Sequence, residues 1–257
     1  MSTSRVAAVT GGGRGIGRAI ALAFARGGVS VALLARSQPR LAQVAAEIAG
    51  AGGRAHPIAC DVTSKSAVDE AFAEAASVLG PIDILVNSAG VADSAPFTRL
   101  DETQWDRTIA VNLKGTFLCT RAAIGGMVAR GTGRVINIAS VAGRIGVPYT
   151  AAYCASKHGV LGLTRSVAIE VARTGVTVNA ICPGFVNTDM TSDAVARIAR
   201  TTGRTEPQAR EALEAMNPQR RLVQPEEVAA VAVFLISDAA AGITGQAIDV
   251  DGGQFMA

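Results

Sequence analysis

Residues 5–20 read RVAAVTGGGRGIGRAI and join a short apolar run to a glycine-rich turn and then to a segment with helical periodicity. The run 5–10 has the apolar and β-branched composition of a buried strand. The glycines at 11, 15 and 17 permit positive φ and let a ligand approach the main chain closely. Amide groups at the N-terminus of the following helix, expected over 15–26, bind phosphate. The stretch therefore predicts a dinucleotide site, although its G-x-x-x-G-x-G spacing differs from the usual G-x-G-x-x-G pattern.

The rest of the chain repeats this alternation of strand and helix. Further strands are expected at 29–35, 55–60, 82–87, 134–140, 176–182 and 246–252. Further helices are expected at 39–50, 64–79, 101–130, 151–173 and 225–237. Most of the strands are continuous apolar runs, which is typical of parallel sheets covered on both faces. We predict an α/β fold in which residues 1–257 form a single Rossmann-type domain, a doubly wound parallel sheet of seven strands with helices on both faces.

Composition excludes several classes of protein. The 24 basic and 21 acidic residues give a net charge of +3, which does not indicate binding to nucleic acid or to a membrane. No apolar run approaches the roughly 18 residues of a membrane span. The N-terminus does not resemble a signal peptide, so we expect a cytoplasmic protein. The cysteines have no C-x-x-C spacing, and neither disulfides nor a metal site are expected from Cys60, Cys119, Cys154 and Cys182.

Residues 188–222 interrupt the alternation between the strand at 176–182 and the helix at 225–237. The segment is too long for an ordinary connection in a compact domain, and long insertions of this kind are usually functional. We expect it to be a lid over the substrate.

The end of the second strand indicates which dinucleotide is bound. An acidic side chain there binds the ribose 2′-hydroxyl of NAD, but this chain has Ala35 followed by Arg36. Arg14 in the glycine turn reaches the same region. Two guanidinium groups suit a 2′-phosphate, so the sequence favours NADP(H). NAD(H) stays possible, because both arginines can also be solvated surface residues.

The stretch AAYCASKHG, residues 151–159, places Tyr153 and Lys157 four positions apart on one face of a helix. A neighbouring ammonium group lowers the pKa of a phenol, which then exchanges a proton with a carbonyl or alcohol oxygen near neutral pH. Ser140 ends the strand expected at 134–140, at the edge where α/β sheets bind ligands. Its hydroxyl is expected to hold the same substrate oxygen.

Eight ordered segments make the chain resemble the short-chain dehydrogenase/reductase family: TGGGRGIG, CDVTS, GPIDILVNSAG, VNLKGTF, GRVINIAS, YCASK, VNAICPGFVNT and ITGQAIDVDGG. The resemblance implies that Tyr153 is the general acid/base and that Ser140 orients and polarises the carbonyl. It implies that Lys157 binds the nicotinamide ribose and lowers the pKa of Tyr153. Asn112 would hold a water molecule that links Lys157 to solvent.

The resemblance also implies where the cofactor binds. The glycine turn would contact the pyrophosphate and adenosine, residues 61–62 the adenine, residues 87–90 the floor of the cleft, and residues 183–188 the nicotinamide. Ser88 departs from the second Asn that is usual in the family. The candidate cofactor-binding residues, with Arg36 included, are Gly11, Arg14, Gly15, Ile16, Gly17, Arg36, Asp61, Val62, Asn87, Ser88, Ala89, Gly90, Tyr153, Lys157, Pro183, Gly184, Val186 and Thr188.

Within the family, the chain is most similar to 3-oxoacyl thioester reductases and aromatic polyketide ketoreductases, on the segments ARGTGRVINIAS and PGFVNT. This implies reduction of a ketone carried on CoA or an acyl carrier protein, and the apolar segment VAGRIGVPYT at 141–150 is an expected pocket wall. Arg130 and Arg173 lie close to positions at which such reductases bind the carrier.

Two alternatives stay open. One is an NAD(H)-dependent secondary-alcohol or hydroxysteroid dehydrogenase, and the other is an NADP-binding sensor without catalysis. We also expect a homotetramer, in which the helices 101–130 and 151–173 and the C-terminal segment form the interfaces.

Overall fold

The computed structural model of the protein describes residues 5–256, and within them seven strands form one parallel sheet in the order β3-β2-β1-β4-β5-β6-β7. This confirms the predicted fold class. The strands are β1 (Val6–Thr10), β2 (Ser30–Ala35), β3 (Ala55–Ala59), β4 (Ile84–Asn87), β5 (Gly133–Ile138), β6 (Val176–Pro183) and β7 (Ala247–Val250). The predicted strand 134–140 ends earlier, at Ile138, so Ser140 lies in the loop beyond the sheet rather than in its last pleat.

The direction in which the sheet grows reverses between β1 and β4. Thr10 is level with Leu34 of β2 on one side and with Asn87 of β4 on the other. Chain crossovers leave in opposite directions from such a point, which leaves a crevice outside the carboxyl ends of the strands. The fold thus places the glycine turn, which follows Thr10, at the edge of that crevice.

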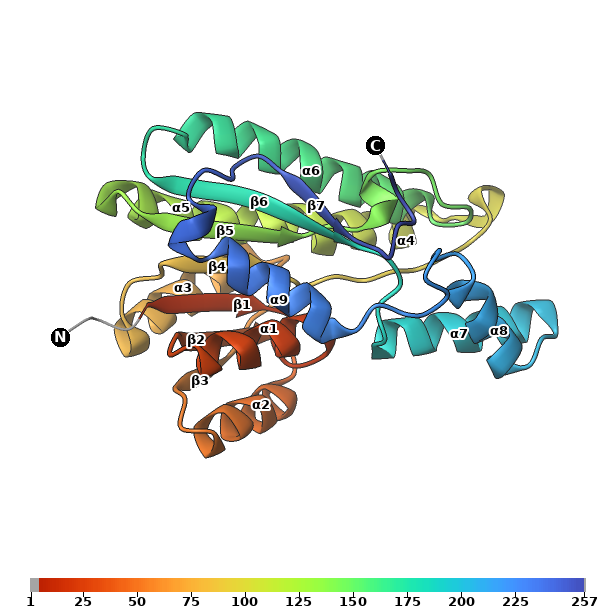
Figure 1. The fold of residues 1–257 in the computed structure, drawn as a ribbon, viewed down its shortest axis with the longest axis horizontal. Coiled ribbons are helices and arrows are strands. Elements are labelled where there is room, and N and C mark those ends of the chain that lie inside the picture. The colour runs from red at the N-terminus through yellow and green to blue at the C-terminus, as the bar shows by residue number, and fades with distance from the viewer. Residues whose placement is uncertain (1–4, 257) are drawn as a thin grey trace.

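Helices cover both faces of the sheet (Figure 1). One face carries α1 (Gly15–Arg26), α2 (Gln38–Gly50) and α9 (Pro225–Leu235), and the other carries α3 (Lys65–Leu79), α5 (Gly115–Arg130) and α6 (Ala151–Val171). Side chains alternate along each strand, so Ala7 and Val9 pack into the first core, and Val6 and Ala8 into the second. This two-sided burial explains the continuous apolar runs.

The helix predicted over 101–130 is interrupted. It consists of α4 (Glu102–Ile109), the π-helical turn η2 (Ala110–Lys114) and α5. Thr116 Oγ1 donates a hydrogen bond to the Asn112 carbonyl oxygen at 2.8 Å, so this carbonyl in the widened turn has a donor. Wide turns of this type often occur at functional sites, and this one contains Asn112.

The segment 188–222 contains two helices, α7 (Asp189–Thr202) and α8 (Glu206–Glu214), which project beyond the carboxyl ends of the strands (Figure 1). Val195, Ala209 and Leu213 form a small core between them. The Asn187 amide donates to the Val223 carbonyl at 2.9 Å, and this bridge closes the base of the segment. The helices α7 and α8 therefore pack on each other and are joined to the rest of the domain at the bridge between Val186 and Val223.

The short helical turns are η1 (Phe97–Arg99), η3 (Val141–Gly143) and η4 (Asp238–Ala240). Across the described residues, no helix combines the length and apolar character needed to cross a bilayer. The same residues include no cluster of three or more His, Cys, Asp or Glu side chains placed to hold a metal ion.

Candidate active site

A cavity of about 1700 Å³ opens at the carboxyl ends of the strands, between the sheet and α7. The predicted site residues line it, with the exception of Asn87 and Asn112. Those that line it are Gly11, Arg14, Gly15, Ile16, Gly17, Arg36, Asp61, Val62, Ser88, Ala89, Gly90, Ser140, Tyr153, Lys157, Pro183, Gly184, Val186 and Thr188. Residues far apart in the sequence thus meet around one volume large enough for a dinucleotide and a substrate.

The glycine turn packs directly against the turn after β4. Gly11 has φ 68°, and a Cβ atom there would lie 2.9 Å from the Ser88 carbonyl oxygen. A Cβ atom at Gly17 would lie 2.4 Å from the Gly11 carbonyl oxygen. Thr10 Oγ1 accepts hydrogen bonds from the Ser88 and Ala89 amides, at 3.0 and 3.1 Å. Glycine is needed here because two backbone turns touch, and the result is a side-chain-free cradle at the N-terminus of α1 that fits a pyrophosphate.

Three arginines surround the far end of the cradle. Arg14 Nη1 and Arg40 Nη1 each lie 3.6 Å from Asp189 Oδ2 at the start of α7. Arg36 lines the same part of the cavity and faces Asp61. The pKa of Asp61 is lowered, first by the hydrogen bond from the Thr63 amide, with smaller contributions from the Thr63 hydroxyl and from Arg36.

Sequence reasoning missed Arg40. Its position four residues after Arg36, in the first turn of α2, was the available signal. Together with Arg14 and Arg36, it makes this end of the cavity suitable for an anionic group such as a 2′-phosphate.

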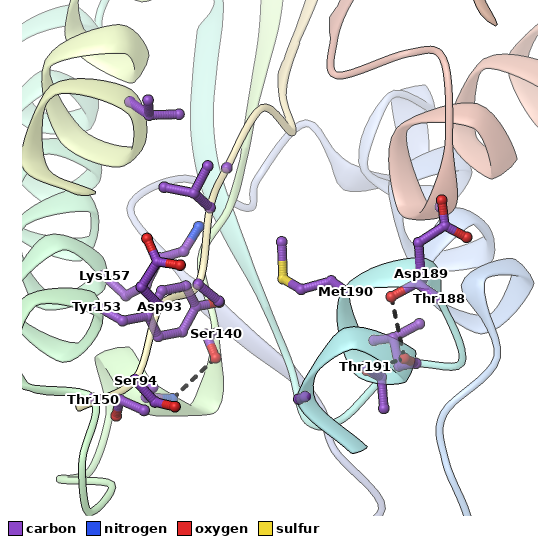
Figure 2. Close-up of a pocket in the computed structure, with 18 of the residues that line it drawn as sticks. Asp93, Ser94, Ser140, Thr150, Tyr153, Lys157, Thr188, Asp189, Met190 and Thr191 are labelled. Carbon is purple, nitrogen blue, oxygen red and sulfur yellow. Dashed lines mark hydrogen bonds between the residues drawn. The ribbon is translucent and has the colours of Figure 1, made fainter. Parts of the chain in front are cut away.

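Ser140 and the two side chains from α6 stand on one wall of the cavity, and Thr188–Thr191 stand opposite (Figure 2). Ser140 Oγ accepts a hydrogen bond from the Ala142 amide at 3.1 Å, and its side chain also bonds to Tyr153. Lys157 Nζ donates to the Ile138 carbonyl at 2.7 Å and lies 5.6 Å from the centroid of the Tyr153 ring. The wall therefore presents a phenol and a hydroxyl side by side, backed by a buried amine.

Burial shifts the pKa values of both Tyr153 and Lys157. Burial raises the pKa of Tyr153, and the hydrogen bond with Ser140 opposes that rise. Burial also lowers the pKa of Lys157 to about 8. The Lys157 ammonium is directed at the Ile138 carbonyl, and its effect on the pKa of Tyr153 stays a prediction. A phenol with a raised pKa is protonated at neutral pH.

Asn112 is buried behind the wall rather than exposed to the cavity. Its Oδ1 accepts from the Val91 amide at 2.9 Å, and its Nδ2 donates to the Val91 carbonyl and to Ser156 Oγ, both at 3.0 Å. The side chain thus ties the loop after β4 to α6, next to Lys157. The proposed water relay stays a prediction.

The turn 87–90 was predicted to line the floor of the cleft; Ser88, Ala89 and Gly90 line the cavity, but the side chain of Asn87 does not. Asn87 Nδ2 donates to Thr120 Oγ1 at 3.0 Å and to Asn137 Oδ1 at 2.8 Å, and the residue is buried. The alternation of β4 turns this side chain away from the crevice and toward α5. Asn87 therefore joins β4, β5 and α5.

The opposite end of the cavity is lined by the predicted wall 141–150 and by segments that sequence reasoning did not assign. The Ala95 amide donates to the Tyr149 carbonyl at 2.8 Å, and this joins the loop after β4 to the wall. Tyr149 has φ 66°, a conformation rare for residues other than glycine and often found at functional sites. Met190 and Met216 from the 188–222 segment add apolar surface.

The two arginines considered for binding a carrier lie elsewhere. Arg130 Nη2 donates to the Ile82 carbonyl at 2.5 Å, just before β4 begins, and Arg173 lies just before β6. Both positions are at the amino ends of the strands, and the structure does not bring them to this cavity.

Comparisons with known proteins agree with this geometry. Residues 11–254 match the family model described as Enoyl-(Acyl carrier protein) reductase. The chain is 43% identical to a 3-oxoacyl-[acyl-carrier-protein] reductase of Synechocystis sp. over 99% of this chain and 98% of that protein. It is 41% identical to a D-beta-hydroxybutyrate dehydrogenase of Rhizobium meliloti over 97% and 98%, respectively. A crystal structure of a single-residue variant of the actinorhodin polyketide ketoreductase with NADPH superposes with a TM-score of 0.95 at 40% identity, covering 98% of this chain and 97% of that one.

Proposed function

Because this chain belongs to the short-chain dehydrogenase/reductase family, we propose that it is an NADP(H)-dependent carbonyl reductase whose substrate is a 3-oxoacyl thioester of CoA or an acyl carrier protein. The observation that carries the proposal is the placement of Ser140, Tyr153 and Lys157 on one wall of a cavity whose far end is a phosphate cradle. The named relatives support a ketone as the oxidised substrate.

The residues present fit an NADP(H) molecule. The cradle formed by Gly11 and Gly17 would hold the pyrophosphate, and Arg14, Arg36 and Arg40 would hold the 2′-phosphate. The NADPH in the similar ketoreductase structure supports this choice. When bound, the cofactor supplies a hydride to the carbonyl carbon.

The chain's own contribution is to bind and protonate the carbonyl oxygen. Tyr153 Oη, which is protonated at neutral pH, donates its proton to that oxygen. Ser140 Oγ, whose lone pair already accepts from the Ala142 amide, donates a second hydrogen bond to the same oxygen. Asn112 keeps the Val91 loop and α6 in register, so that Lys157 stays behind Tyr153.

The helices α7 and α8 act in this proposal as a lid over the substrate. Asp189 meets Arg14 and Arg40 on the cofactor side, so one end of the lid is positioned by residues that hold the cofactor. Met190, Leu213 and Met216 line the cavity from the lid and favour an acyl chain. The single-domain organisation, the homotetramer and the cytoplasmic location also stay proposals.

The test is to measure kcat/KM for NADPH and for NADH, each with acetoacetyl-CoA and with a bulky neutral ketone. The reaction is monitored by the loss of nicotinamide absorbance. The proposal predicts that NADPH with the thioester gives the highest value. NADH with the free ketone as the best pair would favour the alternative, an NAD(H)-dependent secondary-alcohol or hydroxysteroid dehydrogenase, which the hydroxybutyrate dehydrogenase relative also supports. Absence of oxidation with every ketone would leave the NADP-binding sensor.

A further inference from the structure

Arg197 crosses the mouth of the cavity. It lies on α7, its side chain is half-buried, and it lines the cavity from the lid side. Its Nη1 donates to Ser94 Oγ at 3.0 Å, across a sequence separation of 103 residues. Ser94 belongs to the loop after β4, which the Ala95–Tyr149 hydrogen bond joins to the opposite wall. The Arg197 guanidinium therefore sits where lid, loop and wall meet.

The charge of Arg197 is not balanced by an acidic partner. Among residues 5–256, no carboxylate lies within ion-pair distance of it. Each carboxylate that lines the cavity already faces other cations: Asp61 faces Arg36, Asp93 pairs with Arg107, and Asp189 pairs with Arg14 and Arg40. A guanidinium carries five donors in a planar fork that matches anionic oxygens. Among the described residues, the Arg197 guanidinium donates only to the neutral hydroxyl of Ser94.

The chain between the catalytic residues and Ser94 limits how far Arg197 lies from the reacting carbonyl. A Cβ atom at Gly90 would lie 3.9 Å from Lys157 Nζ, so Gly90 marks the catalytic end of the loop. Four Cα–Cα steps lead from Gly90 to Ser94 and span at most about 14 Å. The Arg197 guanidinium is thus within reach of one end of a substrate whose carbonyl lies at Tyr153.

We propose that Arg197 binds an anionic oxygen group carried by the substrate and thereby selects 3-oxo compounds that bear such a group. The group is the carboxylate of a free 3-oxo acid or a phosphate of a pantetheine-containing thioester, since both offer the same recognition chemistry. The inference rests on the proposed reductase function and names the substrate feature that the lid recognises.

The test compares acetoacetate, acetoacetyl-CoA and the neutral thioester acetoacetyl-N-acetylcysteamine at saturating NADPH. The variants are Arg197→Gln, Arg197→Lys, Ser94→Ala and Arg200→Gln. Arg200 is the matched control, because it is exposed on the same helix and does not line the cavity. Ser94→Ala removes the hydrogen bond of Arg197 and keeps its charge. NADPH Kd reports whether each variant is folded.

We expect Arg197→Gln to lower kcat/KM for at least one of the two anionic substrates by about tenfold or more. The neutral thioester should change less than about twofold, Arg197→Lys should restore part of the loss through its charge, and Arg200→Gln should match the wild type. Loss confined to acetoacetate identifies the carboxylate, and loss confined to acetoacetyl-CoA identifies the phosphate.

An equal loss on all three substrates, matched by Ser94→Ala, would show that Arg197 only positions the lid and would overturn the inference. Unchanged values on all three would overturn it as well. A wild type that oxidises NADPH with the neutral thioester as fast as with the anionic substrates would overturn the inference and leave the reductase function standing. A wild type inactive with every ketone would overturn both.

Discussion

Replacing Lys157 with Met should remove a pH dependence from the stability of the protein. Lys157 is 5% exposed, and burial lowers the pKa of its ammonium from 10.5 to about 8. Between these values the unfolded chain binds more protons than the folded one, so stability rises with pH across that window. From about pH 7 to about pH 9.5, this one group should add about 2 kcal/mol to the free energy of unfolding of the wild type.

The assay is urea unfolding of the wild type and of Lys157→Met at these two pH values and one protein concentration. Unfolding is monitored by circular dichroism. Effects of Lys157→Met that do not depend on pH, such as the lost bond to Ile138, cancel in the comparison. The wild type should gain about 2 kcal/mol more than the variant over the pH step. Lys114→Met, at an exposed lysine, should follow the wild type. Parallel behaviour of wild type and Lys157→Met would refute the burial argument.

Three further changes test the site. Tyr153→Phe removes the proton donor and should lower kcat by about 10²–10⁴-fold while NADPH Kd, measured by fluorescence titration, stays the same; retained turnover would exclude this role. Arg36→Ala should weaken NADPH by about tenfold and NADH much less in the same titration, and equal effects would remove its phosphate role. Gly17→Ala places a Cβ atom 2.4 Å from the Gly11 carbonyl oxygen. It should lower the free energy of unfolding in urea by about 1–3 kcal/mol and raise NADPH Kd, and an unaffected variant would contradict the described packing.

The fold could be predicted from local sequence patterns, because strands buried on both faces are continuous apolar runs. The glycine-rich turn after β1 could be predicted as well, because so many glycines between a strand and a helix indicate a phosphate-binding turn. The same holds for Tyr153 and Lys157, whose four-residue spacing fixes a common helix face. Ser140 was predictable as the end of a strand, although β5 stops at Ile138 and the serine lies in the loop.

Other features depend on packing between distant segments. Asn87 ends a strand as Ser140 was expected to, yet it turns toward Thr120 because strand alternation places it on the α5 side. Asn112, in the π-helical turn, bonds to Val91 and Ser156, and no local pattern reveals these contacts. The raised pKa of Tyr153 depends on how deeply the ring is buried, which the sequence does not show. The lid contact from Arg197 to Ser94 is likewise a tertiary fact.

The most direct test of the central claim is to follow the hydride. Acetoacetyl-CoA is incubated with the enzyme and NADPH deuterated at C4, with each C4 hydrogen labelled in turn, and the product is examined by mass spectrometry and NMR. The account predicts 3-hydroxybutyryl-CoA with one deuterium at C3 from one of the two labelled cofactors, and none from Tyr153→Phe on the same timescale. Oxidation of the cofactor without deuterium at C3, or no oxidation of the cofactor at all, would contradict it.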